Sequence, residues 1–166
     1  MPFAYYDRLT QRQQRIYRRS DGVAAIPIPR PEELTPKVAA LRAALQDEDR
    51  LGVEVASENL LHALAGLFRV PPVRVQVLAV RPSRNWGELH GLYHGADGGD
   101  AARVTVWMRT AQRHQPVKFR TFLRTLLHEL CHHLDYTLLA LPDSFHTEGF
   151  YKRESSLLRQ LVADDA

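Results

Sequence analysis

The sequence predicts an α+β fold in which a small three-stranded sheet packs on a long central helix, with additional helices toward both ends of the chain. Apolar residues recur at helical spacing in several segments, and alternating apolar and polar residues mark three short strands. The segment from about Val117 to Leu139 carries Leu and Phe on more than one face. That pattern is typical of a helix buried at the centre of a domain.

The composition is that of an ordinary globular domain. The chain has 166 residues, of which 45% are apolar and 25% are charged, enough for one domain with its own core. We divide it into an Arg-rich N-terminal helix with a Pro-containing linker over residues 1–30 and a single domain over residues 31–166. The net charge of +3 is too small to identify a polyanion as the partner.

No segment has the features of a secretory leader or of a membrane span. Residues 1–14 contain charged side chains and no apolar run, and no stretch approaches the roughly 20 apolar residues that cross a bilayer. The single cysteine, Cys131, excludes an intrachain disulfide. We therefore expect a cytoplasmic protein without a membrane partner, stabilised by packing or by a metal.

The first half of the chain is predicted to be helical. A polar helix over Asp7–Arg19 carries several arginines, which we expect to form a solvated face rather than a phosphate-contacting arm. Prolines make residues 26–31 extended. A second helix follows with Thr35 as its cap, and a third runs from about Val53 to Phe68.

The second half contains the strands, the central helix and one further helix. Strands are predicted over Val73–Val77, Leu89–His94 and Arg103–Met108, and together they form a small antiparallel or mixed sheet. The central helix ends before Pro142. A last helix is expected over Glu148–Val162, with its apolar residues on one face.

The central helix contains the segment His128-Glu129-Leu130-Cys131-His132. Four residues along a helix correspond to about 6 Å of rise and about 40° beyond one full turn, so both histidines project from the same face. Neutral imidazoles at this spacing suit a shared zinc ion. Glu129 follows the first histidine and is placed to accept a proton from a water molecule at the metal.

A third metal ligand has to come from outside this segment, because one helix does not surround an ion. His146 is the favoured candidate, since the chain can fold back over the site after the proline turn. Asp135 and Glu148 are alternatives, and Asp135 fits better as an acceptor that orients an imidazole N–H. His133 lies one helical step away from the ligand face and is predicted to pack or to lie at the surface.

These residues resemble the SprT-like zinc metallopeptidases, which have a zincin fold. The resemblance rests on the strand Val104–Met108 and the helix after it, on the segment from His128 to His132, and on the segment His146–Phe150. It implies that His146 is the third ligand and that the strand Val104–Met108 borders a groove where a peptide adds as a further strand. Thr147 stands where the family usually has Gly, and the four-cysteine zinc ribbon of some relatives is absent.

We therefore expect zinc-dependent hydrolysis of a peptide bond, with Zn²⁺ as cofactor and a peptide or protein as substrate. Glu129 is the expected general base, and Tyr151 is the expected donor to the developing oxyanion. One alternative is a non-catalytic, zinc-stabilised domain that binds protein or nucleic acid. Another is a zinc hydrolase of a non-peptide amide. Structural zinc sites usually have four ligands, whereas this chain offers three good ones and an adjacent glutamate.

Overall fold

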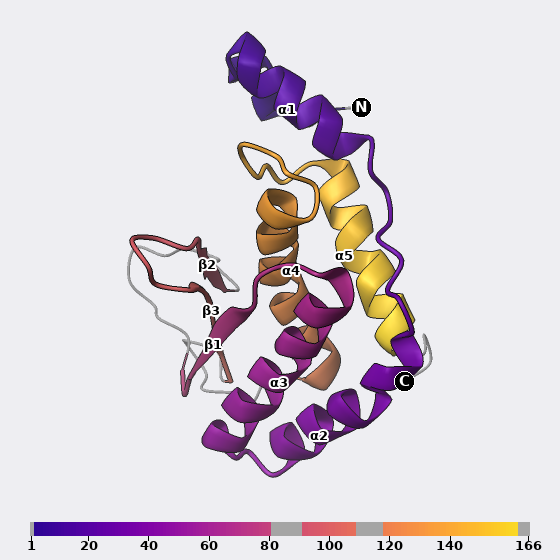
Figure 1. The fold of residues 1–166 in the computed structure, drawn as a ribbon, viewed down its shortest axis with the longest axis vertical. Coiled ribbons are helices and arrows are strands. Elements are labelled where there is room, and N and C mark those ends of the chain that lie inside the picture. Colours follow the sequence, from indigo (N-terminus) through magenta and orange to yellow (C-terminus); the bar gives the residue numbers. More distant parts are fainter. Residues whose placement is uncertain (1, 81–90, 109–117, 163–166) are drawn as a thin grey trace.

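Five α-helices and three short strands make up the part of the chain that this computed structural model describes, residues 2–80, 91–108 and 118–162 (Figure 1). The elements follow in the order η1 (a 3₁₀ turn, Ala4–Arg8), α1 (Gln11–Asp21), η2 (a 3₁₀ turn, Pro31–Leu34), α2 (Thr35–Gln46), α3 (Arg50–Phe68), β1 (Val73–Leu78), β2 (Leu92–His94), β3 (Ala102–Trp107), α4 (Phe119–Thr137) and α5 (Glu148–Leu161). The α+β class expected from the sequence is confirmed.

The three strands form a mixed sheet in the order β1-β3-β2. β1 is parallel to β3, with Val75 opposite Val104, and β2 is antiparallel to β3, with Tyr93 also opposite Val104. β3 is therefore the central strand, hydrogen-bonded on both sides. The expectation that a peptide adds at the strand Val104–Met108 is wrong for the paired part of β3, because β2 occupies that edge.

α4 lies at the centre of the molecule, between α5 on one side and the sheet on the other (Figure 1). Its leucines are buried on several faces, as Leu126, Leu127 and Leu130 show, which confirms the prediction of a central helix. α3 packs against β1 and α2 packs against α3. In the described part of the chain, no helix combines the length and the apolar character that crossing a bilayer requires.

The N-terminal helix begins later than the sequence pattern suggested. Thr10 caps α1 in a reciprocal arrangement, since Gln13 N donates to Thr10 Oγ1 at 3.1 Å and Thr10 N donates to Gln13 Oε1 at 2.9 Å. This Thr-x-x-Gln capping box is a recognised helix start. The expectation of one continuous helix from Asp7 was therefore wrong, and the 3₁₀ turn η1 precedes α1 instead.

Two other helix starts differ from those expected. Thr35 is not a cap: it has helical dihedral angles, and η2 leads directly into α2 without a side-chain cap. α3 begins at Arg50 rather than at Val53, because Asp49 Oδ1 accepts a hydrogen bond from Gly52 N at 3.1 Å. A side-chain acceptor at this position satisfies one of the free N–H groups of the first turn.

The segment before residue 30 contacts α5 along much of its length. Ile26 and Ile28 are buried in the main core. Ile28 N donates to Gln160 Oε1 at 2.8 Å, and Gln160 Nε2 donates to Ile26 O at 2.9 Å. This segment therefore contributes to the core, and the domain division at residue 30 stays a prediction.

Candidate metal centre

The packing of α4 sets the direction in which its two histidines point. Leu127, Leu130 and Leu134 are fully buried, so they define the core-facing side of the helix. His128 and His132 lie one turn apart on the side that faces α5 and the loop before it, and their ring centroids are 5.2 Å apart. The two imidazoles are therefore adjacent, as the four-residue spacing of the histidines along the helix predicts.

His146 reaches the same place from the loop between α4 and α5. The loop turns back after α4, where Ala140 adopts a left-handed conformation with a φ of 53° and Leu141 N donates to Asp135 O at 2.8 Å. The next helix begins directly after His146, because Thr147 Oγ1 caps α5 by accepting from Phe150 N at 2.8 Å. Tyr5 also donates its hydroxyl hydrogen to the His146 carbonyl at 2.8 Å.

The three imidazoles converge through their Nε2 atoms. His146 Nε2 lies 2.9 Å from His132 Nε2 and 3.2 Å from His128 Nε2, and all three ligand atoms lie within 4.8 Å of one another. A tetrahedral ion with metal–nitrogen distances of about 2.0–2.1 Å holds its nitrogens about 3.3 Å apart. The cluster therefore fits a metal ion.

Hydrogen bonds at the far side of the α4 rings determine which nitrogen faces the cluster. Ser144 Oγ donates to Asp135 Oδ2 at 2.7 Å, so Ser144 accepts the Nδ1–H of His132, with 2.8 Å between Nδ1 and Oγ. His128 Nδ1 donates to Glu154 Oε1 at 2.6 Å. With Nδ1 protonated, the neutral ring presents the lone pair of Nε2. Such outer contacts orient histidine ligands in metal sites.

The environment keeps the rings of His132 and His146 uncharged. Burial lowers the pKa of His132 to about 3, with further lowering by His146 and His128. The pKa of His146 is also lowered, first by burial and then by His128, while Glu154 raises it. A neutral imidazole is the form that binds a metal, so His132 and His146 are in the metal-binding form near neutral pH.

Glu129 lies beside the cluster and is nearly inaccessible to solvent. Its side chain is 6% exposed, and Oε2 lies 4.0 Å from His128 Nε2. Burial raises the pKa of Glu129 to about 7, while His128 lowers it and Glu154 raises it. Gly91 lies directly against this side chain: a Cβ there would be 3.0 Å from Glu129 Cγ and 3.1 Å from Oε2. The chain just before β2 therefore approaches Glu129 closely because residue 91 has no side chain.

The other residues considered from the sequence occupy different positions. Asp135 is fully buried against Ser144 and Arg153, so it acts on His132 through Ser144 rather than as a member of the cluster. Glu148 is paired with Lys152 at 3.3 Å. Among the residues that the structure describes, only His128, His132 and His146 form a group of three or more potential ligand side chains.

Tyr151 borders the cluster from the first turn of α5. The residue is 41% exposed, and its ring centroid lies 6.0 Å from that of His128 and 5.8 Å from that of His146. Burial raises the pKa of Tyr151, with a further contribution from Glu154. The hydroxyl therefore keeps its proton near neutral pH and can act as a hydrogen-bond donor.

Two residues of this site, Glu154 and Ser144, were not predicted from the sequence. Glu154 follows Phe150 by four residues and precedes Leu158 by four, so it lies on the apolar face of α5. A carboxylate on a buried face requires a partner, and that placement was the available signal. Ser144 carried no comparable signal, because its role depends on how the loop folds against α4.

A comparison of the chain with protein-family models, with curated proteins and with solved structures finds no match among any of them. What the structure does show is a group of three histidines that could bind a metal ion. Its likeness to the SprT-like metallopeptidases stays a prediction.

Proposed function

We propose that this chain is a zinc-dependent peptidase with a zincin-like fold, related to the SprT-like metallopeptidases. The observation that carries the proposal is the convergence of three Nε2 atoms beside a buried glutamate, with the Nδ1 atoms of both α4 histidines engaged elsewhere. Three histidines and an open position are typical of catalytic zinc sites, whereas structural sites usually have four protein ligands.

His128, His132 and His146 are the residues that would hold the ion. A zinc ion at such a site polarises the substrate carbonyl and lowers the pKa of a water molecule. Glu129 accepts the proton of the attacking water and delivers it to the leaving amine, for which a pKa of about 7 is well suited. Tyr151 donates a hydrogen bond to the oxyanion that develops on the substrate.

The sheet supports a peptide as the substrate. Among the described strands, β2 lies at an edge of the sheet and packs against α4, and its Tyr93 contacts the ring of His132. An extended peptide can pair with such an edge and pass over the cluster. The alternative of a non-peptide amide substrate has no comparable support.

The test is metal analysis combined with cleavage of an unfolded protein such as casein, with and without DNA. Glu129→Gln is expected to retain one zinc ion per chain and to lose cleavage by about 100-fold or more. His132→Ala is expected to lose zinc, whereas His62→Ala, which changes an exposed histidine of α3, keeps it. Wild-type cleavage by the Gln variant would refute the base assignment, and stoichiometric zinc in His132→Ala would refute the ligand role.

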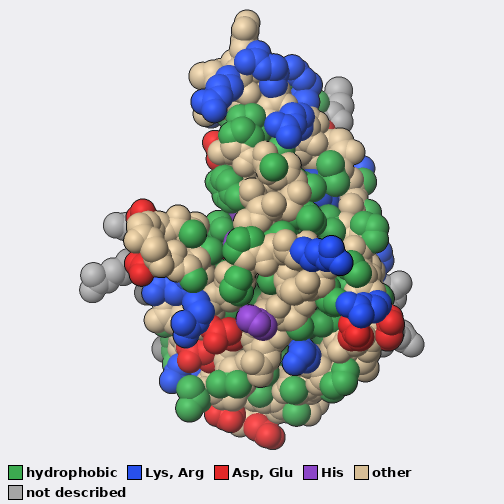
Figure 2. Space-filling view, in the orientation of Figure 1, with side chains coloured by type: hydrophobic (Ala, Val, Ile, Leu, Met, Phe, Trp, Pro, Cys, Tyr) green, Lys and Arg blue, Asp and Glu red, His purple; other side chains and the backbone are tan. Residues whose placement is uncertain are grey.

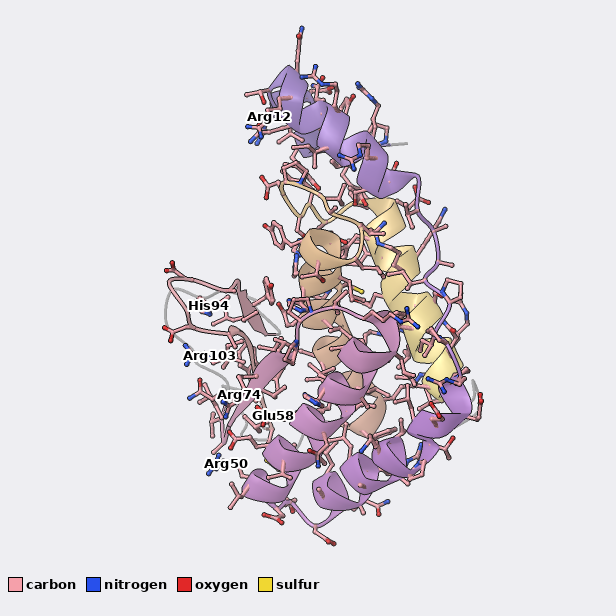
Figure 3. All side chains as sticks on the ribbon, viewed as in Figure 1. Arg12, Arg50, Glu58, Arg74, His94 and Arg103 are labelled. Carbon is pink, nitrogen blue, oxygen red and sulfur yellow. The ribbon has the colours of Figure 1, made fainter. Side chains whose placement is uncertain are left out.

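Exposed arginines favour a second function, a zinc-stabilised domain that binds nucleic acid. Figure 2 shows basic side chains gathered at the end of the molecule that α1 forms, and exposed arginines of this helix are Arg12, Arg15, Arg18 and Arg19. Figure 3 places Arg12 far from the sheet arginines, of which Arg74 is paired with Glu58 at 2.8 Å. Bound zinc with no cleavage, together with salt-sensitive DNA binding lost on substituting the α1 arginines, would favour this function.

A further inference from the structure

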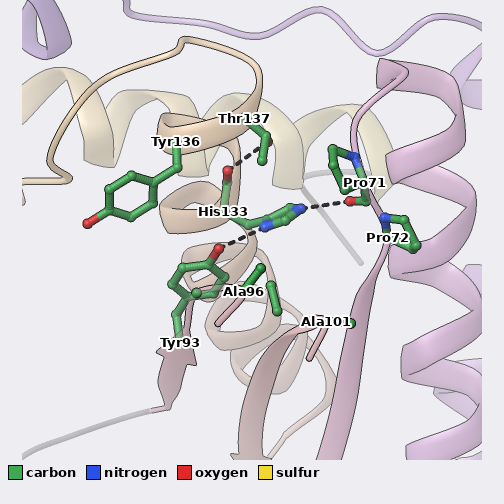
Figure 4. Close-up of a pocket in the computed structure, with 10 residues that line it drawn as sticks. Pro71, Pro72, Tyr93, Ala96, Ala101, His133, Tyr136 and Thr137 are labelled. Carbon is green, nitrogen blue, oxygen red and sulfur yellow. Dashed lines mark hydrogen bonds between the residues drawn. The ribbon is translucent and has the colours of Figure 1, made fainter. Parts of the chain in front are cut away.

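A pocket of about 590 Å³ opens beside the metal centre (Figure 4). Ligand pockets in proteins occupy about 300–1,000 Å³, so this one accommodates a bulky group. It lies between β2, the last turns of α4 and the turn before β1. Its walls are formed by prolines, alanines and aromatic rings, chiefly Pro71, Pro72, Tyr93, Ala96, Ala101 and Tyr136.

The polar side chains of the wall are already bonded within the protein. His133 Nε2 donates to Pro71 O at 2.8 Å, and a carbonyl only accepts, so His133 Nδ1 accepts the hydroxyl hydrogen of Tyr93 at 2.8 Å. Thr137 Oγ1 donates to His133 O at 2.7 Å. Tyr136 donates to Asp143 at 3.4 Å. A polar occupant would therefore find few free partners, which favours an apolar one.

Tyr93 joins the pocket to the metal centre. Its ring stacks on His132, with centroids 6.4 Å apart and an interplanar angle of 22°. On the pocket side the same ring stacks on Tyr136, with centroids 6.2 Å apart and an angle of 16°. One side chain thus separates a candidate metal ligand from the pocket. A molecule that reacts at the cluster can therefore place its neighbouring group in this pocket.

The direction of β2 indicates which neighbouring group this is. The chain approaches Glu129 at Gly91 and then reaches His132, His133 and Tyr136 at Tyr93. β2 therefore runs in the same direction as α4. A peptide that pairs antiparallel with this edge, the more stable arrangement, runs the opposite way. Its residues before the reacting bond then lie on the side of Tyr93.

We propose that this pocket binds an apolar, preferably aromatic, side chain of a peptide, on the N-terminal side of the bond that is cleaved. The inference rests on the proposed peptidase function for the position of that bond, but the binding of the side chain can be measured without turnover. The pocket thereby defines the substrate class as peptides with a large apolar residue shortly before the cleavage point.

The test uses the full chain with zinc and fluorescent peptides in which a single Phe, at successive positions, interrupts a Ser/Ala background. Binding is measured by anisotropy in a Glu129→Gln background, and cleavage products of the wild type are identified by mass spectrometry. The Phe peptide is expected to bind about 10- to 100-fold more tightly than its all-Ala counterpart. Cleavage is expected to leave Phe in the N-terminal product.

Ala101→Phe fills the pocket from an exposed position and is expected to abolish the preference for Phe while leaving the all-Ala peptide unaffected. Ala40→Phe, which changes an exposed alanine of α2, is the matched control and keeps the preference.

Equal binding of the two peptides, or an equal effect of Ala101→Phe on both, overturns the pocket assignment even if casein is cleaved. Tighter binding of the Phe peptide without cleavage of any peptide would refute the peptidase function but would support the pocket assignment. Phe in the C-terminal product overturns the antiparallel direction.

Discussion

Replacing Arg153 by methionine tests how the N-terminal segment is held to the part of the fold that carries the histidine cluster. Arg153 is completely buried and forms an ion pair with the equally buried Asp135, with 3.1 Å between Nη2 and Oδ1. It also donates to Ser20 O, to Ser20 Oγ at 2.8 Å and to Val23 O at 2.7 Å. Methionine retains an unbranched side chain but no donor, so Asp135 is left as a buried carboxylate without its cation.

Breaking a fully buried ion pair on one side costs about 3–5 kcal/mol. That loss is a large part of the roughly 5–15 kcal/mol by which a domain is stable. With an m value of about 2 kcal/mol/M in urea, the unfolding midpoint falls by about 2 M. Adding Asp135→Asn removes the uncompensated charge, so the double variant is expected to recover part of the loss.

The loss of stability in Arg153→Met is expected to depend on pH, because Asp135 can take up a proton in the folded state. Burial raises the pKa of Asp135 above its ordinary value of 3.8, although Ser144 and Arg153 lower it. A group whose pKa is raised in the folded state contributes stability that is complete below its unfolded pKa and is lost as pH rises through the folded pKa. Without Arg153 that pKa rises further. The difference in stability between Arg153→Met and the wild type is therefore smaller at about pH 5 than at about pH 7.

Urea unfolding followed by circular dichroism provides the measurement. Arg159→Met is the matched control, because Arg159 is exposed on the same helix, and it is expected to change stability by only about 0.5 kcal/mol. A midpoint for Arg153→Met equal to that of Arg159→Met would refute the reasoning. A loss that grew toward lower pH would refute the assignment to Asp135.

Three further substitutions test the support of His132 and the packing of α5 against the N-terminal segment, with Gly66→Ala as the control for the latter. Ser144→Ala removes the acceptor of the His132 Nδ1–H, and zinc affinity measured by chelator competition is expected to fall about 10- to 100-fold; unchanged affinity would exclude that support. In Gly149→Ala the new Cβ would lie 2.5 Å from Asp21 O, which predicts a loss of about 1–3 kcal/mol in thermal unfolding. Gly66→Ala meets no atom within 4 Å and is expected to be neutral or stabilising by up to about 1 kcal/mol. Similar melting temperatures of Gly149→Ala and Gly66→Ala would contradict the clash at Gly149.

Much of the candidate site could be predicted from local patterns in the sequence. The apolar repeat of α4 predicted a central helix, and helical spacing predicted that His128 and His132 share a face. The residues alone left three candidates for the third ligand, His146, Asp135 and Glu148. The structure brings His146 to the pair and leaves Asp135 and Glu148 elsewhere, because the turn after α4 directs the loop back over the helix.

The sequence by itself determined which segments form helices and strands, though not where each helix begins. It also determined the position of the His-Glu-x-x-His segment within a buried helix and the small number of side chains able to join it. Only the tertiary structure decided that β2 pairs with β3 and packs beside α4, that Glu154 and Ser144 orient the histidines, and that Arg153 ties Asp135 to the N-terminal segment. The physical reason is separation along the chain. Periodicity reports which face of one element is apolar, whereas these contacts join elements whose relative placement depends on the packing of the whole core.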